Sequence, residues 1–89
     1  KEAREQALED RAVLERDLRE QRELSAHMLQ SVEAEIQLVE ERVQSIQRKV
    51  TVGVMSPEDP ELLQLRRELL GLQRKAEELR MIVRRQSRE

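Results

Sequence analysis

Apolar residues recur every three or four positions through two long segments of the chain. In the first segment they are Leu29, Val32, Ile36, Val39, Val43, Ile46 and Val50. In the second they are Leu62, Leu65, Leu69, Leu72, Ala76, Leu79 and Val83. A seven-residue repeat sustained over such a length is typical of helices that pack in a coiled coil. We therefore predict two long helices, each with one apolar row that faces another helix.

The segment KVTVGVMSPEDPELL, from Lys49 to Leu63, separates the two rows. Gly53 adopts a left-handed backbone at low cost and is suited to end a helix. Asp59 is a good N-cap, and Pro60 after it fits the first helical position. These signals favour a chain that turns back on itself. The predicted fold is all-α: an antiparallel coiled-coil helical hairpin with a long helix over about 1–52, a turn over about 53–59 and a helix over about 60–88.

Antiparallel pairing gives the two rows a register in which Val32 faces Val83 and Ile36 faces Leu79. The predicted hairpin seam consists of Val32, Ile36, Val39, Val43, Ile46, Val50, Leu65, Leu69, Leu72, Ala76, Leu79 and Val83. This register also brings together two pairs of opposite charge and one pair of like charge: Glu33 with Arg80, Lys49 with Glu68, and Arg42 with Lys75. Exposed pairs contribute about 0–1 kcal/mol each, so the register is predicted from the apolar rows and not from the charges.

The first helix is longer than the second, so residues 1–25 are expected to project as an arm of roughly 38 Å. Its apolar residues do not follow a clean heptad repeat. The arm is either a coiled-coil stalk shared with a second copy or a lone helix, and we favour dimerisation. Residues 26–89 are predicted to form the hairpin. Because the chain starts without Met and ends in helical composition, we expect it to be a fragment of a larger protein.

The second helix carries apolar residues beyond those that one seam needs. They are Leu63, Leu70, Met81 and Ile82. A widened apolar face is typical of bundle helices. We predict a partner interface here, for a helical protein or for a second copy in a homodimer with a four-helix arrangement. At the tip, Val52, Val54 and Met55 either plug the end of the seam beneath the turn or form a recognition patch.

Composition narrows the function classes. The chain has 89 residues, of which 40% are charged, with no aromatic residue and no cysteine. A compact globule of this length usually needs aromatic or disulfide-linked residues, whereas long helices do not. The charges alternate in sign without a basic stripe, which argues against nucleic acid. No apolar run reaches the roughly 18–20 residues of a membrane span, so we expect no membrane insertion and favour the cytoplasm, with the cytoskeleton as one location there.

The residue types present do not suggest catalysis. His27 is the only histidine and cysteine is absent, which excludes nucleophilic triads and histidine-based metal sites. Gly71 lies within the second helix, where it marks either the close approach of another backbone or a neutral substitution. Ser56, before Pro57, is a candidate phosphate acceptor. We expect no enzymatic activity, no cofactor and no metal.

The sequence MSPEDPELLQLRRELLGLQRKAEELRMIV follows the turn. Together with the helix before it, from Val43, this segment resembles the antiparallel coiled-coil fingers of Rho-effector proteins. Its part EDPELLQLRRELLGLQRK is similar to the C-terminal helical hairpin of scaffolds of the disrupted-in-schizophrenia type. The Gly-Ala pair usual in the first helix of the Rho-effector fingers is absent. The resemblance implies a helical hairpin that binds small GTPases or coiled-coil partners.

Two functions remain open at this point. The first is a non-catalytic protein–protein interaction and oligomerisation module of a cytoplasmic scaffold or adaptor. The alternative is an effector finger that binds a Rho- or Rab-type small GTPase according to its bound nucleotide. The sequence does not identify the partner.

Overall fold

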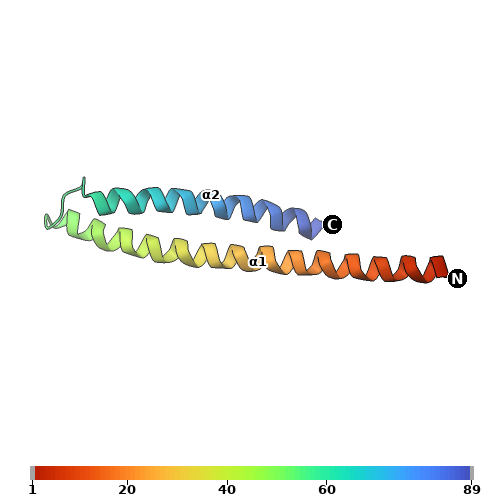
Figure 1. Ribbon diagram of the computed structural model, residues 1–89. Coiled ribbons are helices and arrows are strands. Elements are labelled where there is room, and N and C mark those ends of the chain that lie inside the picture. Colours follow the sequence, from red (N-terminus) through yellow and green to blue (C-terminus); the bar gives the residue numbers. More distant parts are fainter. Residues whose placement is uncertain (1, 89) are drawn as a thin grey trace.

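The computed structural model describes residues 2–88, and they form two antiparallel helices joined by one turn (Figure 1). Helix α1 spans Glu2–Thr51 and helix α2 spans Pro60–Arg88. The described part of the chain measures 78 × 18 × 14 Å. The prediction of an all-α helical hairpin is confirmed, with helix bounds within one residue of those expected at the turn.

Helix α1 ends in a glycine cap. Gly53 has a φ of 80°, and its N–H donates to the carbonyl oxygen of Val50 at 3.1 Å. The N–H of Val54 donates to the carbonyl oxygen of Lys49 at 2.9 Å. These two bonds form a Schellman motif, which needs a left-handed residue that glycine adopts without strain. The chain therefore leaves the helix axis directly after Val52.

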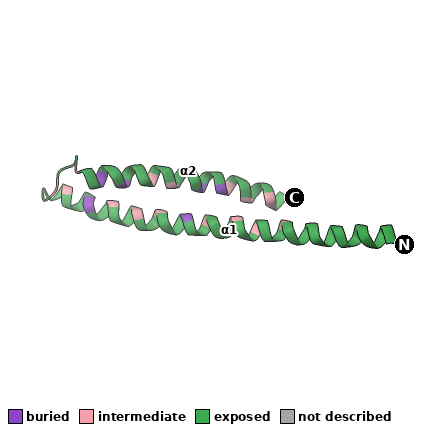
Figure 2. Cartoon of the chain, viewed as in Figure 1, coloured by how far each residue is buried: buried purple, intermediate pink, exposed green. Residues whose placement is uncertain are grey.

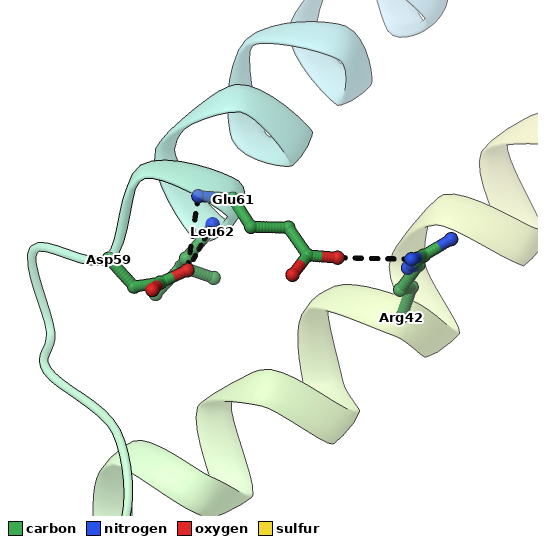
Figure 3. A network of polar contacts seen from close by, with 4 residues as sticks. All are labelled: Arg42, Asp59, Glu61 and Leu62. Atoms are coloured by element: carbon green, nitrogen blue, oxygen red, sulfur yellow. Dashed lines mark hydrogen bonds and ion pairs between the residues drawn. The ribbon is translucent and has the colours of Figure 1, made fainter.

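Helix α2 begins at the N-cap that the sequence predicts. The carboxylate of Asp59 accepts hydrogen bonds from the backbone N–H groups of Glu61 at 3.0 Å and Leu62 at 3.3 Å (Figure 3). Before it, the carbonyl oxygen of Ser56 accepts from the N–H of Asp59 at 3.1 Å, and Pro57 lies inside this turn. Asp59 thus satisfies two N–H groups that a helix start leaves without partners.

The core is the line where the two helices face each other (Figure 2). One cluster contains Leu29, Val32 and Ile36 from α1 with Leu72, Ala76 and Leu79 from α2. A second cluster contains Val39, Val43, Ile46 and Val50 from α1 with Leu62 and Leu65 from α2, and Met55 from the turn. All twelve residues of the predicted seam are buried or half-buried. Leu62, at the hinge end, is fully buried.

The register predicted from the sequence is wrong by one heptad. The two clusters place Val32 level with Ala76 instead of Val83, and Ile46 level with Leu62 instead of Leu69. The error arose because sliding one heptad row along another by seven residues leaves the pattern of apolar contacts unchanged. The turn decides between the two registers, since it folds over the end of α1 and inserts Met55 into the second cluster.

The charges agree with the observed register. Glu33 pairs with Arg80 at 3.8 Å, as predicted, and Arg42 pairs with Glu61 at 3.0 Å (Figure 3). The expected like-charge contact of Arg42 with Lys75 is therefore replaced by an attractive one. No Lys49–Glu68 ion pair within 4.0 Å is found between these two described residues.

The change in register shortens the projecting arm. Leu18, Arg22 and Ser25 are half-buried, although the sequence placed them on the free arm. Residues 2–17 are all exposed. The overlap of the two helices therefore extends about one heptad further along α1 than expected, and the half-buried polar residues Arg22 and Gln86 lie toward its open end.

The burial of Leu62 predicts a large effect of its truncation. Leu62→Ala should lower the free energy of unfolding by about 2–5 kcal/mol, because it removes a fully buried side chain. Circular dichroism during thermal and urea unfolding measures the loss. Leu63→Ala is the matched control, since Leu63 is 43% exposed, and it should change stability far less. Equal losses in the two variants would contradict the proposed packing.

The register predicts distances between spin labels. Cysteine is absent from the chain, so labels can be placed at Ser45 and Gln64 or at Val52 and Gln64, all of which are exposed. The Ser45–Gln64 distance should be shorter than the Val52–Gln64 distance. Labelled chains are diluted with unlabelled protein so that only distances within one chain are measured. A seven-residue slide, about 10 Å along the axis, would reverse this order. Pulsed electron paramagnetic resonance distinguishes the two outcomes.

Candidate protein-interaction surfaces

The residues considered for chemistry lie apart on solvated helix faces. His27 is exposed, and so are the neighbouring pairs Glu40–Glu41 and Glu77–Glu78. Among residues 2–88 no group of three or more His, Asp, Glu or Cys side chains could hold a metal ion. Within this same range neither helix is both long and apolar enough to cross a bilayer. The surfaces that distinguish this hairpin are therefore its exposed apolar side chains.

The four residues predicted as one partner interface lie on two different sides of α2. Leu63, Leu70 and Met81 are 43%, 59% and 54% exposed, and they share one side because seven and eighteen residues are close to whole numbers of helical turns. We call these three residues the outer stripe. Ile82 follows Met81 by one residue and is therefore rotated by about 100° around the helix. It points to a second surface.

Arginines surround the outer stripe. Arg67 and Arg74 lie between its apolar residues on the same side of α2, and both are exposed. Met81 shares a shallow depression with Arg84, Arg85 and Arg88. Glu77 and Glu78 are the acids on this side, and Glu77 pairs with Arg80 at 3.3 Å. The outer stripe is therefore apolar with a basic border.

The second surface lies where both helices border a groove. An open depression of about 460 Å³ is lined by Glu35, Leu38, Val39, Glu68, Gly71, Leu72 and Lys75. Leu38 stands at one edge, 66% exposed, and Gly71 lies at the opposite edge. We call this side of the hairpin the groove face. Its exposed apolar residues, by helical spacing, are Leu24, Met28, Leu38, Val52 and Ile82.

Gly71 has no structural role inside the hairpin. A Cβ atom added at this position would meet no atom within 4 Å. Of the two explanations given by the sequence, the close approach of another backbone is not found among residues 2–88, whereas a neutral substitution agrees with the open space. The absence of a side chain leaves a hollow directly beside Leu38.

The groove face carries one row of residues from each helix, and the charges in the two rows have opposite signs at matching levels. Read from the open end to the hinge, one row of α1 consists of Met28, Glu35, Arg42 and Lys49. The facing row of α2 consists of Ile82, Lys75, Glu68 and Glu61. In the observed register Met28 lies at the level of Ile82, and Glu35, Arg42 and Lys49 lie at the levels of residues of opposite charge. Arg42 makes its 3.0 Å ion pair with Glu61 within these rows.

The three tip residues separate into two groups. Met55 is half-buried and packs into the second core cluster, as the plug interpretation predicts. Val52 and Val54 are 72% and 75% exposed, as the alternative interpretation of an exposed patch requires. Val52 borders a depression with Gln44, Gln47, Arg48 and Thr51. The tip is therefore partly core and partly surface.

Comparison of the chain with protein families, with curated proteins and with solved structures finds no match. A helical hairpin alone does not define a function, since one fold serves many. The interaction surfaces must therefore be judged from their own chemistry.

Sequence reasoning missed Leu38 as a surface residue. It lies between the seam residues Ile36 and Val39 and does not belong to the heptad row. That position was a usable signal, because an off-row leucine in a two-helix seam must face outward. The position of Leu38 beside Gly71, however, depends on the register of the two helices, so the sequence alone could not reveal it.

The two glycines predict opposite results for the same substitution. Gly53→Ala should lower the free energy of unfolding by about 1 kcal/mol, because the φ of 80° strains any residue with a Cβ. Gly71→Ala should raise it by about 1 kcal/mol, because alanine is the better helix former and nothing obstructs its methyl group. Urea unfolding at low protein concentration measures both. A destabilised Gly71→Ala variant would contradict the open hollow.

Proposed function

We propose that this chain is a non-catalytic protein-interaction and oligomerisation module of a cytoplasmic scaffold or adaptor. The observation that carries the proposal is the outer stripe on α2. Its three apolar side chains are each more than two-fifths exposed, although the seam already supplies the contacts that hold the hairpin together. Apolar side chains aligned on one side of a helix are a common site for docking another helix.

The stripe is long enough for a helix to lie along it. From Leu63 to Met81 it extends for five helical turns, or about 27 Å. The basic border formed by Arg67, Arg74 and the arginines near Met81 favours acidic residues on the partner. The partner that fits is therefore an amphipathic helix with an apolar row and acidic flanks.

The rest of the hairpin supports the stripe mechanically. The seam holds α2 against the longer α1, and caps at Gly53 and Asp59 define both helix ends at the turn. A preordered helix loses less conformational entropy on binding than an unfolded segment does. The hairpin thus presents the outer stripe as a rigid docking surface.

A peptide titration tests this function. The probe is a helical peptide with leucines at seven-residue spacing and glutamates on both flanks, and the same peptide with lysine flanks serves for comparison. The wild-type chain should bind the acidic peptide more tightly than the basic one. Leu63→Glu with Leu70→Glu should weaken that binding by roughly tenfold or more, because it introduces charge into the apolar contact.

Leu38→Glu is the matched control, since it makes the same change on the groove face. It should leave peptide binding unchanged, and circular dichroism should show intact helices in all variants. Crosslinking in cells compares the proteins bound by the wild-type chain with those bound by the variant that carries Leu63→Glu and Leu70→Glu. The proposed function is contradicted if neither peptide binds and the two chains crosslink to the same proteins. Capture of a small GTPase in one nucleotide state only would instead support an effector finger.

A further inference from the structure

We propose that the groove face is the contact between two copies of this chain, which lie parallel with their hinges at the same end. Leu38 of each copy fills the hollow at Gly71 of the other. The inference rests on the proposed oligomerisation function, and it assigns self-association to a different surface from the outer stripe.

The two edges of the groove face have complementary shapes. Leu38 and Gly71 border the same depression, one on each helix. Leu38 projects with two-thirds of its surface exposed, whereas Gly71 leaves open space where a side chain would stand. A two-fold axis parallel to the hairpin places α1 of one copy over α2 of the other without shifting either along its length. Each leucine then lies over a glycine, and the contact occurs twice.

The charges of the groove face match under this symmetry as well. Under the same axis the α1 row lies over the α2 row of the other copy at matching levels. Met28 then meets Ile82, Glu35 meets Lys75, Arg42 meets Glu68, and Lys49 meets Glu61. These two rows are therefore complementary to each other at four successive levels, as the isologous contact of a two-fold dimer requires.

The opposite orientation fits less well. A two-fold axis across the hairpin at the level of this hollow would place α1 over α1, so that Leu38 would meet Leu38 and Gly71 would meet Gly71. Met28 would then lie against Lys49 and Ile82 against Glu61 at the two ends. Two leucines would compete for one space while the two hollows faced each other. The parallel arrangement avoids each of these mismatches.

The exposed arm fits the same orientation. Leu14 is 58% exposed on the part of α1 that α2 does not reach. It lies two heptads before Met28, on the groove-face side of α1. A parallel dimer places both arms at the same end and in the same direction, as the stalk predicted from the sequence requires.

Disulfide crosslinking tests the contact directly, because the chain contains no cysteine. Leu38→Cys and Gly71→Cys are prepared as separate full-length chains, each with a different tag, and are mixed under oxidising conditions. A disulfide needs Cα atoms within about 7 Å, so the mixed pair should crosslink efficiently while neither chain crosslinks to itself. Leu38→Cys dimers formed alone would show the opposite orientation and overturn the proposal.

Sedimentation equilibrium supplies a second measurement. Gly71→Leu fills both hollows while it replaces glycine with a better helix former, so the hairpin should remain folded. The dimer dissociation constant should rise roughly tenfold or more, because the leucine obstructs Leu38 of the other copy. Leu63→Glu, on the outer stripe, should leave that constant unchanged.

The outcomes separate this inference from the proposed function. A wild-type chain that is monomeric at every concentration but binds the acidic peptide would overturn the dimer and leave the docking function intact. A dimer that Leu63→Glu dissociates and Gly71→Leu does not would overturn the groove face as its contact, while self-association itself would stand. A wild-type chain that neither dimerises nor binds the acidic peptide would overturn both proposals.

Discussion

Leu62 is enclosed by the end of α1 and by the returning turn, and the arrangement of the whole hairpin depends on this contact. It packs in one cluster with Ile46, Val50 and Met55, just after the N-cap that starts α2. Because Leu62 must lie level with Ile46, every later residue of α2 has a defined neighbour on α1. The register of the seam, the ion pairs and both exposed surfaces follow from that alignment.

The observed register gives the hairpin two exposed surfaces of different composition. The seam removes one row of each helix from solvent, which leaves an outer stripe on α2 and a groove face shared by both helices. The outer stripe has a basic border, whereas the groove face carries charges of both signs in matching order. A basic border favours an acidic partner, and a self-matching order favours a second copy. One small hairpin therefore has room for two different contacts.

The prediction of the local elements succeeded because each depends on residues close together in sequence. The Schellman cap needs Gly53, the N-cap needs Asp59 before Pro60, and each apolar row is visible as a repeat. The predicted partner interface divides between two sides of α2. Ile82 was grouped with Leu63 and Leu70 as an apolar residue beside the seam, and it lies on another side of the helix. Leu38 was missed because it belongs to no row.

The sequence by itself determined that two amphipathic helices form, where each begins and ends at the turn, and that they pack through their heptad rows. Only the tertiary structure decided the register, since a heptad repeat matches itself equally well after a slide of seven residues. The turn broke that equivalence by inserting Met55 into the core, a contact that no local pattern encodes. With the register came the positions of Arg42 beside Glu61 and of Leu38 beside Gly71, because residues far apart in sequence become neighbours only when the two helices are aligned.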